Sequence, residues 1–419
     1  MDYITTKQAG EKWHISDRRV RMLCTEGKIP GILKPGKSYQ IPAGARKPAD
    51  GRERADNPAA SDKRYLKWDN EVVGVIYKNN AVYFNAPEFN EVMSIYTRGQ
   101  SNWPPEQFNE FLAERVVGRG RRDIERILFR LGLSRYDAPL IAELTRGIHP
   151  KDLLWIAKSR AERLEDAMTD AHASVFLRQT DLTGDSVDTP EGGNIKRYGA
   201  QGGQYGVYKR RISPLTTDAE SEVAVYLLGK KLGVSVCAAV MSDKDTIFST
   251  FRYDFSSEHL VHFRSLFDGA RSDNEYQNLI GVRPQYRDDI ARMILLDFIT
   301  RQEDRHLSNM AIKISGGEES FYALYDNGRS LFYEDTAETV KAAIADPAGY
   351  ATGFGYAGTY WDYTREIARE RGGLGELIRL DVSKKDVRAI LTAAGLAGYR
   401  FAGALEWILK TMDMVRSLA

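Results

Sequence analysis

The spacing of hydrophobic and polar positions changes along the chain. YLKWDNEVVGVIY and AVYFNA, within residues 65–86, are short runs rich in aromatic and β-branched residues, which predicts strands on either side of an Asn79-Asn80 turn. After residue 104 apolar residues recur every three to four positions, which is typical of amphipathic helices. These helices are expected at 105–117, 121–133, 138–148 and 150–168. We therefore expect residues 65–168 to form a mostly helical middle region.

The first 45 residues carry the signals of two short helices and a turn. Thr5 and Gln8 have the spacing of a capping box, and Ser16 is placed to cap a second helix that Gly27 would end. The segment IPGILKPGKSYQIP predicts two short strands around Pro35-Gly36. Residues 1–45 therefore predict a small winged helix–turn–helix.

This segment resembles the winged helix–turn–helix modules of excisionase-like and MerR-like proteins. The resemblance implies DNA binding by Arg18, Arg19, Arg21, Lys34 and Lys37. Residues 1–64 hold 14 Lys and Arg against 8 Asp and Glu, whereas the rest of the chain is slightly acidic. A solvated basic helix or a protein-docking module is the alternative. Residues 46–64 lack apolar periodicity and predict a flexible linker.

The stretch QEDRHLSNMAIKI, residues 302–314, places several polar groups just before a predicted strand. A helix at 284–302 delivers the chain to Asp304, and a predicted hairpin after Asn309 ends near Asp326. The hairpin is expected to bring these three side chains to one end. Carboxylate and amide oxygens suit Mg²⁺, with phosphate oxygens completing its shell, and the remaining acid can accept a hydroxyl proton.

The order Asp-Arg-His-x-x-Asn followed by Asp-Asn-Gly resembles the HipA-like kinases, whose fold is similar to that of the phosphatidylinositol 3/4-kinase group. The resemblance implies an α+β, two-lobed kinase fold, with an N-lobe at 169–255 and a C-lobe at 256–419. It implies ATP and Mg²⁺ as cofactors, Asp304, Asn309 and Asp326 as catalytic residues, and Asn309 and Asp326 as metal ligands. Gln302 is a departure, because relatives commonly carry Asn there.

The segment before this region has the pattern of an N-lobe. Residues 192–211 predict a strand, a Gly-rich turn and a strand, and residues 216–236 predict a helix that ends at Gly233. The resemblance implies that Lys209 binds nucleotide phosphate and that Glu222 is its partner. Lys196 is the rival of Lys209, and Glu220 is the alternative to Glu222.

Further residues follow from the same resemblance. Gly192 and Gly193 would belong to a phosphate-covering loop, in which Ser186 and Thr189 are candidates for phosphorylation in cis. Arg305 and His306 are expected to be structural. Residues 336–419 are expected to be helical, apart from an aromatic and glycine-rich loop at 349–361 that could line a substrate groove.

The composition of the chain indicates where in the cell the protein is located. The chain has no run of about 18 apolar residues and no apolar segment typical of a signal peptide near its start. Its two cysteines, Cys24 and Cys237, match no metal or redox spacing. We expect a cytoplasmic protein that is not bound to a membrane.

The resemblance therefore implies an ATP- and Mg²⁺-dependent Ser/Thr protein kinase of HipA-like type that phosphorylates itself and carries an N-terminal module for DNA or a partner. One alternative is a catalytically inactive, nucleotide-sensing transcriptional regulator, which Gln302 and the helix–turn–helix favour slightly. Another is a lipid or small-molecule kinase, against which the lack of a polybasic patch argues. The protein substrate, and the choice among toxin–antitoxin, growth-control and anti-phage roles, stay open.

Overall fold

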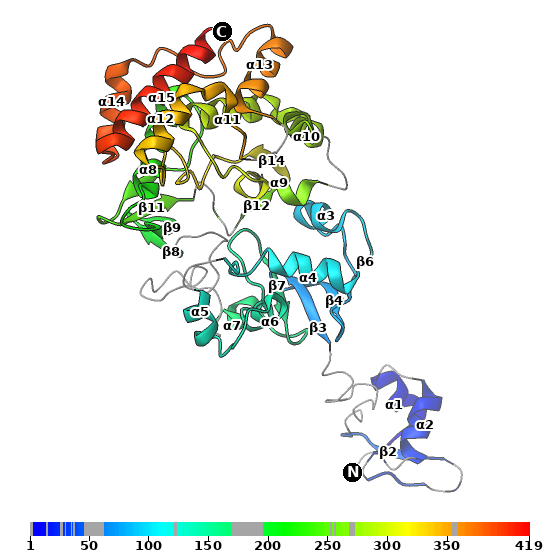
Figure 1. The fold of residues 1–419 in the computed structure, drawn as a ribbon. Helices are drawn as coiled ribbons and strands as arrows, with labels where there is room; N and C mark the ends of the chain where they lie inside the picture. Colours follow the sequence, from blue (N-terminus) through cyan, green and yellow to red (C-terminus); the bar gives the residue numbers. More distant parts are fainter. Residues whose placement is uncertain are drawn as a thin grey trace. The chain divides into compact units, whose positions relative to one another are not determined.

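The chain divides into two units, residues 1–62 and 63–419. The computed structural model describes residues 3–13, 16–25, 28–29, 31–34, 36, 38–45, 63–120, 124–168, 196–251, 254, 257–267, 273–353 and 358–419. Figure 1 shows the elements of each unit along the chain. No helix in these residues is both long and apolar enough to span a membrane.

The first unit contains two short helices and two short strands. α1 (Thr6–Trp13) and α2 (Asp17–Thr25) follow β1 (Tyr3–Thr5), which pairs antiparallel with β2 (Gln40–Pro42). The predicted caps are present, since Gln8 N–H donates to the Thr5 hydroxyl at 3.3 Å and Arg19 N–H to the Ser16 hydroxyl at 3.3 Å. The apolar faces of both helices enclose a small core with Ile41.

The structure corrects the strand pairing in this unit. The two strands expected around Pro35-Gly36 meet only at an isolated bridge between Leu33 and Gln40. The second of them instead pairs with β1, which the sequence pattern did not predict. That pairing holds the fully buried Ile41 against the helices, so burial of one side chain decides the register.

The second unit begins with a five-stranded antiparallel sheet in the order β6-β5-β4-β3-β7. Its strands are β3 (Arg64–Trp68), β4 (Glu71–Ile76), β5 (Val82–Phe84), β6 (Asn102–Trp103) and β7 (Leu154–Ala157). The helices of this region are α3 (Glu91–Thr97), α4 (Pro105–Ala113), α5 (Ile124–Arg130), α6 (Ala138–Leu144) and α7 (Leu164–Ala167). The sheet is larger than the sequence predicted.

The prediction of a helix at 150–168 was wrong. Its first half is β7, whose four residues are all buried and which pairs with β3, and only its end forms the short α7. A short apolar run fits a buried strand as well as a buried helix, and periodicity alone does not separate them. Burial between the sheet and its neighbours therefore decides the conformation of this segment.

A four-stranded antiparallel sheet follows in the order β10-β11-β9-β8. It consists of β8 (Lys196–Gln201), β9 (Gln204–Arg210), β10 (Ala239–Met241) and β11 (Thr246–Thr250). Gly202 and Gly203 have positive φ and form the predicted turn between β8 and β9. α8 (Asp218–Leu232) ends at Gly233 in the left-handed conformation, as the sequence predicted.

The rest of the chain is a three-stranded sheet and a layer of helices. The sheet holds β12 (Glu258–His262), β13 (Ala311–Ser315) and β14 (Glu318–Phe321) in that order. The helices are α9 (Phe263–Leu266), α10 (Glu275–Val282), η2 (Pro284–Tyr286), α11 (Arg287–Thr300), η3 (Leu307–Asn309), α12 (Ala337–Ala345), η4 (Pro347–Gly349), α13 (Tyr360–Arg371), α14 (Lys384–Ala393) and α15 (Gly398–Arg416).

α11 lies at the centre of this helical layer, among the yellow-to-red helices of Figure 1. It contacts α13 and α15, and the Trp407 indole donates to the Phe298 carbonyl at 3.0 Å. Every residue from Met293 to Thr300 is buried. The second half of α11 is thus buried on all sides, and it delivers the chain directly to residues 301–309.

Candidate active site

Lys209, on β9, forms a buried ion pair with Glu222 on α8. The ammonium nitrogen lies 2.6 Å from Glu222 Oε1, and the two side chains are 8% and 4% exposed. The alternative partner, Glu220, instead pairs with Arg211 at 2.6 Å. Of the two glutamates that the sequence left open, Glu222 is therefore the one beside Lys209.

Asp326 follows the three-stranded sheet and reaches the same ion pair. Lys209 Nζ lies 3.0 Å from its Oδ1, and Lys196 Nζ lies 3.1 Å from its Oδ2. Both lysines proposed from the sequence therefore meet at one carboxylate. Since β8 and β9 are adjacent and Lys196 pairs with Lys209 in register, the two ammonium groups come from the same end of the sheet.

These contacts set the charges of the cluster. Burial alone would raise the pKa of Asp326, but Lys196 and Lys209 outweigh it and hold that pKa well below its ordinary value. Burial would likewise lower the pKa of Lys209, but Asp326 and Glu222 raise it above its ordinary value. Lys209 and Asp326 are therefore both charged at neutral pH.

The backbone at Asp326 is specialised. Its φ of 56° lies in the left-handed region, which non-glycine residues adopt rarely and Asp more readily than most. Two residues later, a Cβ added at Gly328 would lie 3.1 Å from the Asp218 carbonyl oxygen and 3.4 Å from Glu222 Oε2. Glycine at this position lets the segment that carries Asp326 approach the first turn of α8.

The loop between α11 and β13 holds Asp304 and Asn309. The Asn309 side-chain N–H donates to the Asp304 carbonyl at 2.8 Å, which leaves the amide oxygen of Asn309 as its acceptor or ligand atom. The Asp304 carboxylate is part-exposed, with Arg329 Nε 3.6 Å from its Oδ2. Asp304 is thus accessible to a molecule that approaches from solvent.

Arg305 joins this loop to the segment that carries Asp326. Its fully buried guanidinium pairs with Asp297 of α11 at 2.9 Å and donates to the carbonyls of Asn309 at 3.0 Å and Tyr325 at 2.9 Å. Tyr325 directly precedes Asp326. The two segments therefore lie side by side, and Arg305 has the structural place that the sequence indicated.

Gln302 makes a second connection that the sequence did not predict. Its Oε1 accepts from the Asp304 N–H at 2.9 Å, and its Nε2 donates to the Asp326 carbonyl at 3.5 Å. The Tyr360 hydroxyl donates to the Gln302 carbonyl at 3.1 Å. In the sequence, the one signal for this role was the position of Gln302, a long amide side chain between an apolar helix and a polar loop.

Asn309 and Asp326 offer the oxygen atoms that Mg²⁺ prefers. Within the described ranges, no three or more His, Cys, Asp or Glu side chains are grouped so that they could hold a metal ion. These residues therefore fit Mg²⁺ only in the manner in which it binds through one or two protein ligands and substrate phosphates.

Several predicted residues lie outside the described residues. They are Ser186, Thr189, Gly192, Gly193 and Lys37. In the first unit Arg18 and Arg21 are exposed on α2, Arg21 pairs with Asp17 at 2.7 Å, and the Lys34 ammonium lies 4.9 Å from the centre of the Tyr39 ring.

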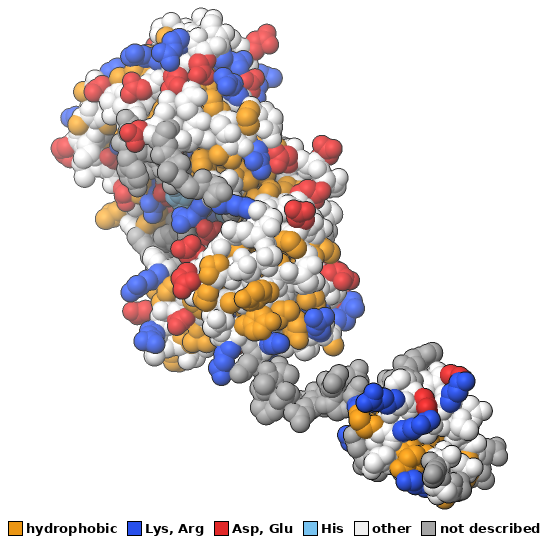
Figure 2. Space-filling model, turned by 90° about the vertical axis from the view of Figure 1, so that its right-hand side faces the viewer, with side chains coloured by type: hydrophobic (Ala, Val, Ile, Leu, Met, Phe, Trp, Pro, Cys, Tyr) orange, Lys and Arg blue, Asp and Glu red, His pale blue; other side chains and the backbone are white. Residues whose placement is uncertain are grey.

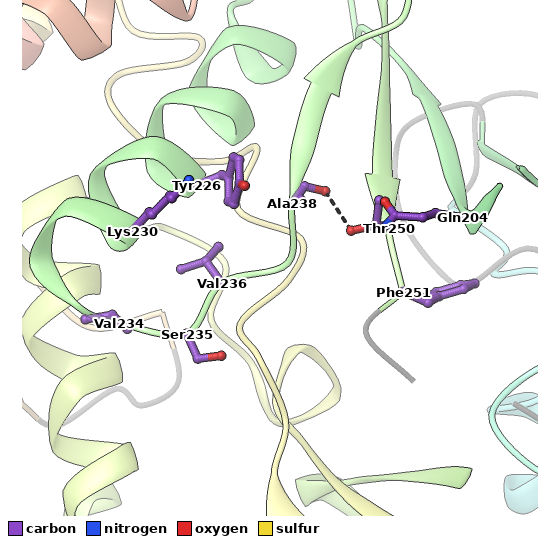
Figure 3. A pocket seen from close by; sticks show the side chains of 9 residues that line it. All are labelled: Gln204, Tyr226, Lys230, Val234, Ser235, Val236, Ala238, Thr250 and Phe251. Carbon is purple, nitrogen blue, oxygen red and sulfur yellow. Dashed lines mark hydrogen bonds between the residues drawn. The ribbon is translucent and has the colours of Figure 1, made fainter. Parts of the chain in front are cut away.

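A separate pocket of about 560 Å³ lies where α8 meets the ends of β10 and β11 (Figure 3). Its lining residues are Gln204, Tyr226, Lys230, Val234, Ser235, Val236, Ala238, Thr250 and Phe251. It contains none of the residues that the sequence assigned to nucleotide, metal or catalysis. The predicted site is thus defined by its ion pairs and not by this hollow.

No family model matches the chain, and no curated protein matches it. Among solved structures, the chain is similar to the Helicobacter pylori proinflammatory kinase CtkA, with a TM-score of 0.41 and 12% identity over 55% of this chain and 89% of that one. It is also similar to HipA from Shewanella oneidensis MR-1, solved with HipB and operator DNA, with a TM-score of 0.46 and 11% identity over 84% and 99%.

Proposed function

We propose that the protein is an ATP- and Mg²⁺-dependent Ser/Thr protein kinase of HipA-like type. The observation that carries the proposal is the buried Lys209–Glu222 pair, which also contacts Asp326. Kinases place a strand lysine, a helix glutamate and a metal-binding aspartate together, because phosphoryl transfer depends on positioning and charge neutralisation. In this chain these three residues come from β9, α8 and the segment after β14, which are far apart in sequence.

Each residue has a role in this proposal. Lys209, with Lys196 beside it, would bind nucleotide phosphates. Asn309 and Asp326 would hold Mg²⁺, which when bound would neutralise phosphate charge. Asp304 would orient the acceptor hydroxyl and accept its proton, and its part-exposed carboxylate is accessible for that purpose.

Lys196 and Lys209 link the binding of the nucleotide to the binding of Mg²⁺. Both oxygens of Asp326 face ammonium groups, at 3.0 Å and 3.1 Å. Nucleotide phosphates would bind the ammonium groups of these two lysines in place of Asp326. The Asp326 carboxylate would then be available as a ligand for Mg²⁺. Binding of the nucleotide and of Mg²⁺ is therefore expected to be cooperative.

The intact mass of the protein after incubation with Mg-ATP tests the proposal. We expect a gain in multiples of about 80 Da, the mass of one transferred phosphoryl group, which peptide mapping would place, with Ser186 and Thr189 as the first candidates. Asp304→Asn should abolish the gain while nucleotide binding is retained. Asp413→Asn removes an exposed carboxylate far along α15 and should behave as the wild type.

The outcomes separate the alternatives. One outcome is that the protein binds ATP but shows no mass gain and no transfer to an added mixture of Ser/Thr peptides. That result would favour the inactive nucleotide-sensing regulator over the kinase. Absence of both ATP binding and transfer would overturn the proposal altogether.

We further propose that residues 1–45 bind DNA. Support comes from the exposed Arg18 and Arg21 of α2 and from the Lys and Arg side chains on the surface of this unit in Figure 2. A mobility-shift titration of duplex DNA at several salt concentrations tests this. Arg18→Gln with Arg21→Gln should weaken binding and flatten its salt dependence, whereas Lys7→Gln, on α1, should change both less.

A further inference from the structure

A second pocket, of about 240 Å³, lies between α5 and the four-stranded sheet. Its lining residues are Arg126, Lys196, Arg197, Tyr208, Arg210, Ser242, Asp243 and Thr246. They come from α5, from the adjacent strands β8 and β9, and from the turn into β11. The pocket is therefore built by elements that are distant in sequence.

The pocket is on the face of the sheet that points away from the candidate active site. Successive side chains of a strand point to opposite faces. Lys209 points toward Asp326, so its neighbours Tyr208 and Arg210 point the other way. Arg197 pairs with Tyr208 in register, and its guanidinium lies 4.4 Å from the centre of the Tyr208 ring. Lys196 is shared by both places, but its ammonium group lies on Asp326.

Cationic side chains outnumber anionic ones among the lining residues of the pocket. Three guanidinium groups, those of Arg126, Arg197 and Arg210, line it, and Asp243 is the single carboxylate among its lining residues. The Asp243 carboxylate accepts a hydrogen bond from the backbone N–H of Asp245 at 2.8 Å, so part of its capacity is used within its own turn. Thr246 and Ser242 add hydroxyl groups to the lining.

We propose that this pocket binds a phosphoryl group carried as a monoester. Guanidinium groups present planar pairs of N–H donors that match the oxygens of phosphate, and a phosphomonoester carries close to two negative charges at neutral pH. The volume is below the range of about 300–1,000 Å³ that small-molecule sites occupy. A single phosphoryl group with a short carrier fits this volume.

The phosphoryl group has two sources with the same chemistry. One is a phosphorylated Ser or Thr side chain of a protein, and the other is a small free phosphomonoester. In either case the site is separate from the transfer reaction, because its arginines are on the opposite face of the sheet from Lys209. A ligand held there would contact both α5 and the sheet that carries Lys209.

The experiment is a binding titration of the full chain with two probes, O-phosphoserine and a fluorescein-labelled Gly/Ala peptide with one central phosphoserine. The unphosphorylated peptide is the probe control. We expect saturable binding of both phosphorylated probes at concentrations up to about 10 mM, and none of the unphosphorylated peptide. Arg197→Gln and Arg210→Gln should each weaken binding about tenfold, the loss expected for a hydrogen bond to a charged group. Arg126→Gln tests the contribution of α5.

Two controls locate the site. Lys244→Gln removes an exposed cation next to Asp243 that does not line the pocket, and should leave binding within about twofold. Lys209→Met disables the predicted nucleotide site and, at a temperature at which its melting curve shows that it is folded, should also leave probe binding unchanged. Loss of probe binding in the folded Lys209→Met variant would show that the probe occupies the active site, and would overturn the proposal.

The remaining outcomes are also decisive. Tighter binding of the phosphopeptide than of phosphoserine assigns the site to phosphorylated proteins, and equal binding assigns it to small phosphomonoesters. The proposal is overturned if neither probe binds, or if Arg197→Gln, Arg210→Gln and Arg126→Gln all keep the wild-type affinity and melting temperature.

Discussion

The side-chain amide of Gln302 connects Asp304 with Asp326. It accepts from the Asp304 N–H at 2.9 Å and donates to the Asp326 carbonyl at 3.5 Å, and it is fully buried. The single side chain of Gln302 thus contacts both segments. We therefore interpret Gln302 as a positioning residue for the proposed acceptor aspartate and metal ligand.

Gln302→Ala is expected to lower the turnover number of phosphoryl transfer by about 10- to 100-fold. The reason is that the Asp304 N–H loses its acceptor and the loop loses its connection to Asp326. The affinity for nucleotide should change little, because Gln302 does not contact Lys209 in any described hydrogen bond. Single-turnover rates and nucleotide titrations measure the two quantities separately.

A conservative series distinguishes positioning from general stability. Gln302→Asn keeps an amide that can accept from the Asp304 N–H, whereas Gln302→Met keeps only the size of the side chain. We expect Asn to retain more activity than Met. Gln107→Ala, which removes a partly exposed glutamine on α4, is the control. An unchanged turnover number in Gln302→Ala would contradict the positioning role.

Lys209→Met is expected to impair both nucleotide binding and stability. Removing this ammonium group leaves Glu222 without its partner at 2.6 Å in a buried place, and removes one of two cations from Asp326. Breaking a buried pair on one side costs about 3–5 kcal/mol in the free energy of unfolding. Urea denaturation and a nucleotide titration measure the two effects.

The matched control for this variant is Lys313→Met. Lys313 pairs with Glu258 at 2.7 Å across the three-stranded sheet, but both side chains are part-exposed, at 26% and 19%. We expect a cost of about 1 kcal/mol or less and no change in nucleotide affinity. Equal costs in the two variants would mean that the Lys209 cluster is not a special ionic site.

Local sequence signals predicted several helices and turns, in the site and outside it. The glycine turn between β8 and β9, the end of α8 at Gly233 and the caps at Thr5 and Ser16 depend on neighbouring residues, so they could be identified without tertiary information. The helical C-terminal region could be predicted for the same reason. Each of these features is decided within a few residues along the chain.

The pairing of side chains depended on tertiary structure. Glu220 and Glu222 are two residues apart on α8, and only packing decides that Arg211 takes the first and Lys209 the second. Likewise, only the structure shows that Asp297, within a buried helix, pairs with Arg305. The segment 150–168 was misassigned because burial decided its conformation and its periodicity did not.

Gly353→Ala should disturb the loop that carries Asp304. A Cβ at position 353 would lie 2.6 Å from the Arg305 backbone nitrogen and 2.8 Å from the Glu303 carbonyl oxygen. Because these neighbours are backbone atoms, one of the two segments must move. We expect a destabilisation of about 1–3 kcal/mol and a loss of phosphoryl transfer, measured by thermal melting and single-turnover kinetics.

Gly281→Ala is the control for this substitution. Gly281 lies in α10, and a Cβ there meets nothing within 4 Å. Alanine is favoured over glycine in a helix by about 1 kcal/mol, so this variant should be as stable as the wild type or more stable. Wild-type kinetics in Gly353→Ala would contradict this prediction, because they would show that the loop can accommodate a Cβ atom at position 353.

Acidification should destabilise the protein through two histidines near β12. Burial, then Lys151, lowers the pKa of His262 to about 3 and holds the pKa of His149 well below its ordinary value. Both are neutral in the folded protein, whereas the unfolded chain binds protons below about pH 6.5. Their contribution to stability is therefore complete above pH 6.5 and is lost as the pH falls toward 3.

The free energy of unfolding should fall between pH 6.5 and pH 5 by up to about 1.4 kcal/mol per pH unit for each histidine. Burial would raise the pKa of Asp152, but Arg115, at 2.7 Å, and Lys151 hold it below its ordinary value, so the loss of its stabilising effect is confined to more acidic conditions. Urea denaturation at several pH values in this window measures the slope. His262→Asn and His149→Asn should each flatten it, and a wild-type protein equally stable at pH 6.5 and pH 5 would contradict two neutral histidines in the folded protein.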